Sequence, residues 1–204
     1  MNNQALLAAL AEKIKICQAC SLYKGATQAV PGEGDPNAQI FFIGEGPGFH
    51  EDKTGRPFVG RAGQLLEQTL ESIGLHRNEV FIGNVIKHRP PENRDPFPTE
   101  ISACNSWLDQ QLAIINPKVV VTLGRFSMAK FLPGTKITLV HGVARKVKER
   151  VVLPMYHPAA ALRSESMSAS FRTDFEKNKE LLLNPDSFQP DSGTANENQI
   201  SLFS

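Results

Sequence analysis

Four short apolar runs, set well apart along the chain, constrain the fold more than any other feature of this sequence. They are rich in β-branched and aromatic residues and cover residues 39–43, 80–86, 118–123 and 151–155. Strands that are apolar at almost every position suit a parallel sheet, because helices cover such a sheet on both faces. The runs therefore predict a central four-stranded parallel sheet.

Helical patterns separate these runs. Apolar residues recur at helical spacing in further segments, at about 3–15, 60–73, 99–115, from Arg125 onward, and 170–183. Strands that alternate with helices in this way predict an α/β protein built as a three-layer α/β/α sandwich.

The composition indicates how the chain divides. With 204 residues, of which 41% are hydrophobic, it can bury one sizeable core, so we expect a monomer with one domain over residues 1–183. Residues 184–204 hold three acids and no Lys or Arg, and few of them are apolar, so this segment is expected to be a disordered tail. No apolar run approaches the length of a membrane span, and the first residues lack the charged start of a signal peptide. These features predict a cytoplasmic protein.

The three cysteines and one histidine form a candidate metal-ligand set. Cys17 and Cys20 make a C-x-x-C pair, and His88 and Cys104 follow far downstream. In a reducing compartment such a pair more often binds a metal or acts in redox chemistry than forms a structural disulfide. Three thiolates and an imidazole fit zinc as well as an iron–sulfur cluster.

Polar residues also stand at the carboxyl ends of the apolar runs, where open α/β folds bind their ligands. Glu45 and Gly46 follow the first run, with Glu51 close behind, Asn84 interrupts the second, and His157 follows the fourth. Each has a purely structural explanation as well: solvated acids on a Gly-rich turn, an amide that bonds to the backbone, a core histidine.

The order of the motifs resembles the family 4 uracil-DNA glycosylases, the iron–sulfur branch of that superfamily. The resemblance covers residues 10–183 and is carried by C-x-x-C at 17–20, GEGPG at 44–48, GRPFVG at 55–60, NVIKHRPPENR at 84–94, Cys104, and HPAAALR at 157–163. It implies an enzyme that flips uracil out of DNA, hydrolyses its N-glycosidic bond and so begins base excision repair.

The resemblance implies a uracil pocket in which Gly46 lies against the base. Phe58 would stack on its ring, Asn84 would read its Watson–Crick edge, and His157 would donate a hydrogen bond to the oxygen that becomes negative. Glu45 is expected to stabilise positive charge on the sugar.

Three further roles follow from the same resemblance. Glu45 or Glu51 would position the attacking water. Leu162 would wedge into the gap left by the extruded nucleotide, and Arg163 would contact phosphate.

The resemblance also implies a 4Fe–4S cluster bound by Cys17, Cys20, His88 and Cys104, with zinc as the alternative. We expect the cluster to have a structural role, joining the N-terminal segment to the loop after the second run. A His in place of the usual family 4 Cys is similar to the X-type glycosylases, which cross-link to DNA. Because the basic insertion of those proteins is missing, we do not expect cross-linking. A non-catalytic uracil-binding module is the other alternative.

The tail ends in Gln199-Ile200-Ser201-Leu202-Phe203. This resembles the short Q-x-x-L-F peptides by which bacterial repair proteins bind the DNA sliding clamp. A polar tether of about 15 residues would reach roughly 20 Å, so the sequence predicts a clamp-binding peptide on a flexible linker.

Overall fold

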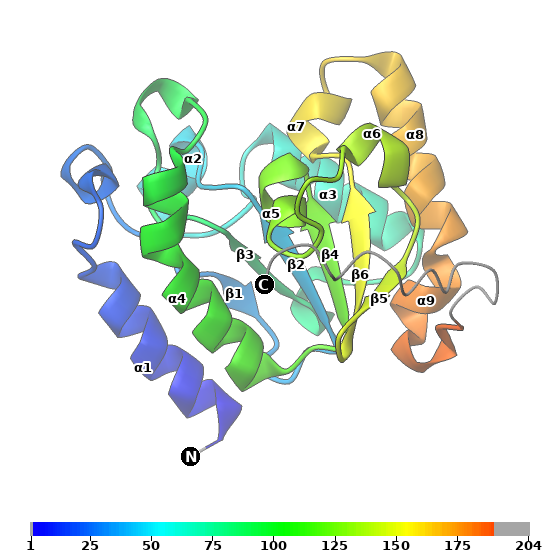
Figure 1. The fold of residues 1–204 in the computed structure, drawn as a ribbon, viewed down its shortest axis with the longest axis horizontal. Helices are drawn as coiled ribbons and strands as arrows, with labels where there is room; N and C mark the ends of the chain where they lie inside the picture. Colours follow the sequence, from blue (N-terminus) through cyan, green and yellow to red (C-terminus); the bar gives the residue numbers. More distant parts are fainter. Residues whose placement is uncertain (1, 190–204) are drawn as a thin grey trace, which may run out of the picture.

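The computed structural model describes residues 2–189. Its centre is one six-stranded sheet in the order β1-β3-β2-β4-β6-β5 (Figure 1). The strands are β1 Glu33–Gly34, β2 Ile40–Gly44, β3 Phe81–Asn84, β4 Val119–Leu123, β5 Arg145–Val147 and β6 Arg150–Met155.

The four inner strands β3, β2, β4 and β6 run parallel, which confirms the predicted parallel sheet. The edge strands β1 and β5 pair antiparallel to β3 and β6 and were not predicted. With two and three residues each, they are too short to produce a periodic pattern.

The helices are α1 Asn3–Lys15, α2 Phe49–Thr54, α3 Arg61–Ser72, α4 Pro98–Ile115, α5 Arg125–Ala129, α6 Ile137–Val140, α7 Pro158–Ala161, α8 Glu165–Lys177 and α9 Lys179–Leu183. Short 3₁₀ turns are η1 Ser21–Lys24, η2 Arg77–Glu79, η3 Pro91–Asn93 and η4 Pro185–Ser187. The single helix predicted over 170–183 is two helices. It begins earlier because the Ser164 hydroxyl accepts a hydrogen bond from the Met167 N–H and caps α8.

Alternate side chains of the inner strands face two separate cores, as the two-residue period of a strand requires. Phe42 and Val121 pack toward α3, α8 and α9, whereas Phe41 and Val120 pack toward α4. Helix α1 packs on α4, and the helices of the other layer lie across the sheet from them (Figure 1). The α/β/α sandwich is therefore confirmed.

The folded part of the chain continues past the predicted boundary at residue 183. Residues 185–187 form η4, Asp186 pairs with Lys118 at 2.5 Å, and Phe188 packs against the core. The clamp-like peptide at 199–203 lies outside the described residues, so the tail stays a prediction. Within residues 2–189 no helix is long and apolar enough to cross a membrane.

Candidate active site

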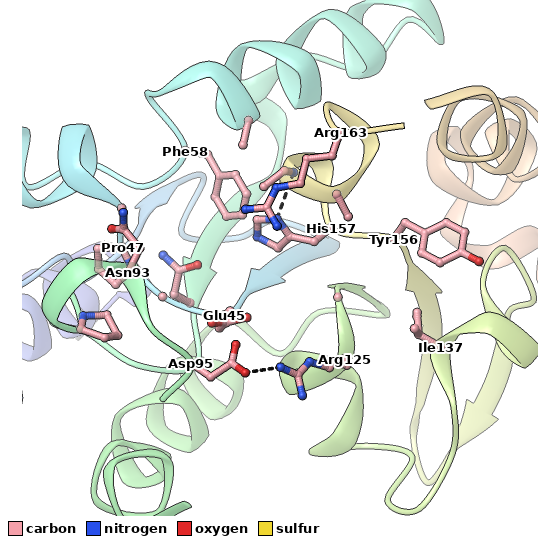
Figure 2. A pocket seen from close by; sticks show the side chains of 18 of the residues that line it. Glu45, Pro47, Phe58, Asn93, Asp95, Arg125, Ile137, Tyr156, His157 and Arg163 are labelled. Carbon is pink, nitrogen blue, oxygen red and sulfur yellow. Dashed lines mark hydrogen bonds and ion pairs between the residues drawn. The ribbon is translucent and has the colours of Figure 1, made fainter. Parts of the chain in front are cut away.

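A cavity of about 640 Å³ opens at the carboxyl ends of the four parallel strands. Its walls come from the segments that follow each strand, because all four chains leave the sheet at this edge. Figure 2 shows Glu45 after β2, Arg125 after β4 and His157 after β6 turned toward the same space. Short local motifs far apart in the sequence therefore meet in one cavity.

The cavity contains most of the residues that the sequence predicted. Those that line it are Glu45, Gly46, Glu51, Phe58, Asn84, His157 and Arg163. Leu162 is 42% exposed and lies next to them at the C-terminal end of α7. A large exposed apolar side chain beside a cavity mouth has the placement that a wedge requires.

Phe58 forms one wall of the cavity, with its ring centroid 5.8 Å from that of His157 (Figure 2). Its backbone has φ of 52°, a left-handed conformation that an aromatic residue rarely adopts. Gly44 lies beneath the ring: a Cβ at that position would be 2.5 Å from the ring and 2.4 Å from the Asn84 side chain. A residue larger than glycine at the end of β2 would displace both side chains.

Asn84 ends β3 and is 1% exposed. Its Oδ1 is buried and has no hydrogen-bond partner among residues 2–189. A buried acceptor without a partner is costly, and such groups are rare in folded proteins. The backbone below it is well supported, because the fully buried Lys87 Nζ donates to the Asn84 carbonyl at 2.8 Å and to Gln111 Oε1 at 2.7 Å.

His157 caps the N-terminus of α7, where its Nδ1 accepts a hydrogen bond from the Ala159 N–H at 3.1 Å. Burial, and secondarily the nearby Arg163, lower the pKa of His157 to about 4 against the opposing charge of Glu51. The ring is therefore neutral near pH 7. Because Nδ1 is the acceptor, the ring proton is on Nε2, so this nitrogen is a hydrogen-bond donor.

The pKa of Glu45 is shifted in the opposite direction, upward. Burial, and secondarily the negative charge of Asp95, raise its pKa to about 7 against the opposing charge of Arg125. Asp95 and Arg125 form an ion pair beside Glu45 (Figure 2). A carboxyl group with a pKa near neutrality can accept a proton from water at neutral pH. Neither Asp95 nor Arg125 was predicted, because nothing local in the sequence marks them.

Glu51 is held by the backbone. Its Oε1 accepts hydrogen bonds from the Val59 N–H at 2.9 Å and the Gly60 N–H at 2.7 Å. This carboxylate therefore fixes the loop that carries Phe58, a role that sequence reasoning did not identify.

The candidate metal ligands gather between α1, η1 and α4. Cys104 is buried in α4. Burial is the main cause that raises its thiol pKa to about 11. Cys20 and Cys17 are near enough to contribute to the rise, while a hydrogen bond from the Lys87 backbone and the Lys87 charge oppose it. The Trp107 indole N–H donates to Cys17 Sγ at 3.2 Å. His88 and Cys17 line a second, smaller cavity of about 220 Å³. Within residues 2–189, no three His, Cys, Asp or Glu side chains are arranged to hold a single metal ion.

Residues 31–182 match the model of the uracil DNA glycosylase superfamily. A type-4 uracil-DNA glycosylase of Sulfurisphaera tokodaii is 48% identical over 85% of this chain and 84% of its own length. Relatives of the same name from Thermotoga maritima and Archaeoglobus fulgidus are 41% and 45% identical. The alignments cover 88% and 84% of this chain and 96% and 91% of those proteins, respectively.

Proposed function

Because the chain belongs to the uracil DNA glycosylase superfamily, we propose that the cavity at the sheet edge binds a uracil flipped out of DNA and that its walls catalyse removal of the base. The protein is a uracil-DNA glycosylase that acts in DNA repair. The convergence of Glu45, Phe58, Asn84 and His157 on one cavity is the observation that supports this assignment of roles.

The flipped base would lie on the Phe58 ring, with its Watson–Crick edge toward the Asn84 amide. Uracil and cytosine differ by a carbonyl and an amino group at one ring position. An amide held to pair with uracil leaves polar groups unpaired when cytosine enters. Sites that recognise a polar group in this way discriminate by roughly 10⁴-fold or more.

As the bond between uracil N1 and the sugar C1′ breaks, its electron pair moves to the base, and a carbonyl oxygen of the uracil becomes negative. His157 Nε2–H would donate a hydrogen bond to that oxygen. A neutral donor already fixed by the Ala159 N–H needs little reorganisation. One such donor typically stabilises the transition state by about 3–4 kcal/mol.

The sugar becomes positive in the same step, and the Glu45 carboxylate would stabilise this charge. Water then adds to C1′, and its proton passes to Glu45, whose pKa near 7 suits a general base. Glu51 is the weaker candidate for this role, because its Oε1 already accepts two backbone hydrogen bonds.

Extrusion of the nucleotide costs a few kcal/mol. Leu162, exposed beside the cavity, would fill the gap in the base stack, and Arg163 would meet a phosphate. This arrangement places an apolar wedge and a cation next to each other at the C-terminal end of α7.

The decisive experiment uses single- and double-stranded oligonucleotides with one uracil, followed by alkaline cleavage of abasic sites. We expect cleavage with the wild type. Asn84→Ala and His157→Ala should lose most activity while still binding DNA. Full activity in both variants would refute the assignment of the cavity. A DNA-bound species that survives denaturing electrophoresis would indicate cross-linking, which we do not expect because the basic insertion of the X-type proteins is missing.

We further propose that Cys17, Cys20, Cys104 and His88 hold a 4Fe–4S cluster. The mutual proximity of the three thiols, the cavity shared by Cys17 and His88, and the indole hydrogen bond to Cys17 support it. Hydrogen bonds to sulfur tune such clusters. The cluster would join the end of α1 to α4 and to the segment after β3, and it takes no part in the chemistry described above.

Visible absorption together with iron and sulfide analysis tests the cluster. A colourless protein with one zinc ion would overturn the proposal.

For the C-terminal peptide we propose clamp binding. Deletion of 199–204 should abolish binding to a bacterial sliding clamp and leave activity on short oligonucleotides unchanged.

A further inference from the structure

The backbone at Phe58 is strained, and the strain aims the ring at the cavity. A non-glycine residue with φ of 52° is unfavourable by itself and persists only where its surroundings hold it. The first turn of α3 packs directly against this peptide, since a Cβ at Gly63 would lie 1.8 Å from the Phe58 carbonyl oxygen. The surroundings must therefore fix both the carbonyl and the amide groups of the loop.

Arg77, in η2 and 19 residues downstream of Phe58, fixes the carbonyls. Its guanidinium donates to the Phe58 carbonyl at 3.1 Å and also to the Pro57 carbonyl. The same guanidinium bonds to the Glu33 carboxylate through Nε at 2.9 Å and Nη2 at 2.7 Å. The Arg77 side chain is only 15% exposed, so these bonds are largely shielded from water.

The amides of the next two residues are fixed from the other side. Glu51 accepts from the N–H groups of Val59 and Gly60. A cation therefore holds two successive carbonyls and an anion holds the two amides that follow. Charge-assisted hydrogen bonds are the strongest in proteins, so they can maintain a conformation that the chain would otherwise leave.

We propose that Arg77, oriented by Glu33, is a positioning residue that keeps the Phe58 ring in its base-stacking conformation. The inference depends on the proposed stacking role of Phe58. Without the guanidinium, the loop relaxes toward ordinary backbone angles, and only a fraction of molecules keep the stacking geometry. The apparent affinity for the base is the intrinsic affinity multiplied by that fraction, whereas turnover of the bound substrate is unchanged.

Arg56 supplies a matched control. It pairs with the same Glu33 carboxylate, through Nε at 2.8 Å and Nη2 at 3.0 Å. Its side chain is 60% exposed, and among residues 2–189 its guanidinium bonds only to Glu33. Arg56→Met therefore removes an arginine of the same network and leaves the hydrogen bonds to the Pro57 and Phe58 carbonyls in place.

The experiment compares Arg77→Met, Arg56→Met and Phe58→Ala with the double variant Phe58→Ala/Arg77→Met. Steady-state kinetics on a uracil-containing oligonucleotide are combined with inhibition by free uracil. For Arg77→Met we expect about tenfold increases in KM and in the inhibition constant for uracil, with kcat within about twofold. For Arg56→Met, we expect KM, kcat and the inhibition constant for uracil each to stay within about twofold of the wild-type value. In the Phe58→Ala background, Arg77→Met should have no further effect.

The outcomes separate this inference from the function on which it rests. If Phe58→Ala itself leaves uracil inhibition unchanged, the stacking role is wrong. If Phe58→Ala weakens inhibition and Arg77→Met does not, the positioning role of Arg77 is wrong. An additional loss in the double variant, or a melting temperature that falls with the inhibition constant unchanged, would show that Arg77 only stabilises the fold.

Discussion

Substitution of Asn84 by leucine should make the protein more stable and much less active. Leucine keeps the branched shape of asparagine but removes the buried Oδ1, which has no partner in the described part of the chain. An unpaired buried acceptor costs about 1–3 kcal/mol. The larger methyl group is crowded against Gly44 and offsets part of the gain. We expect a net gain of about 1 kcal/mol in the free energy of unfolding. For a domain of this size this gain raises the melting temperature by about 2–4 °C.

Thermal unfolding and oligonucleotide kinetics together test this prediction. Asn84→Leu should lose at least about 10²-fold in kcat/KM, because the polar edge of uracil then faces a methyl group. Free uracil should raise the melting temperature of the wild type but not of the variant, since a ligand stabilises only a protein that binds it.

Thr122→Val is the matched control. Thr122 lies in β4, is fully buried, and its hydroxyl also has no partner within residues 2–189, yet it does not line the cavity. This variant should gain similar stability and keep full activity. Two outcomes would refute the reasoning. One is that Asn84→Leu loses stability while Thr122→Val gains it, and the other is that Asn84→Leu remains fully active.

Three more perturbations test the site. Because the pKa of Glu45 is raised to about 7, kcat/KM should fall as the pH drops through 7 and the carboxylate is protonated. Asp95→Asn removes a negative charge, lowers that pKa and moves this limb of the pH–rate profile to lower pH. Leu162→Ala should lose about tenfold more activity on double-stranded than on single-stranded substrate, where little unstacking is required. An equal loss of activity on the two substrates would exclude Leu162 as the wedge. Cys104→Ser should lose iron and visible absorption and melt at a lower temperature, as spectroscopy and calorimetry would show; retained absorption would exclude Cys104 as a ligand.

Much of the fold could be predicted because the inner strands have a strong local signal. Each is buried on both faces, so apolar residues fill nearly every position. The short edge strands and the four-residue helices α6 and α7 carry no such signal, since their positions depend on what they pack against. The early start of α8 was missed because its first turns are rich in serine.

The sequence by itself indicated Glu45, Asn84 and His157 as candidate site residues, which the cavity brings together. Glu45, Asn84 and His157 stand at or just after the ends of parallel strands, and parallel strands bring these ends to one edge of the sheet. The tertiary structure alone decided how each residue behaves. The pKa of Glu45 depends on burial and on Asp95, and the Phe58 carbonyl accepts a hydrogen bond from Arg77. Charges and hydrogen bonds act through space, and partners distant in the chain leave no pattern in the residues around the site.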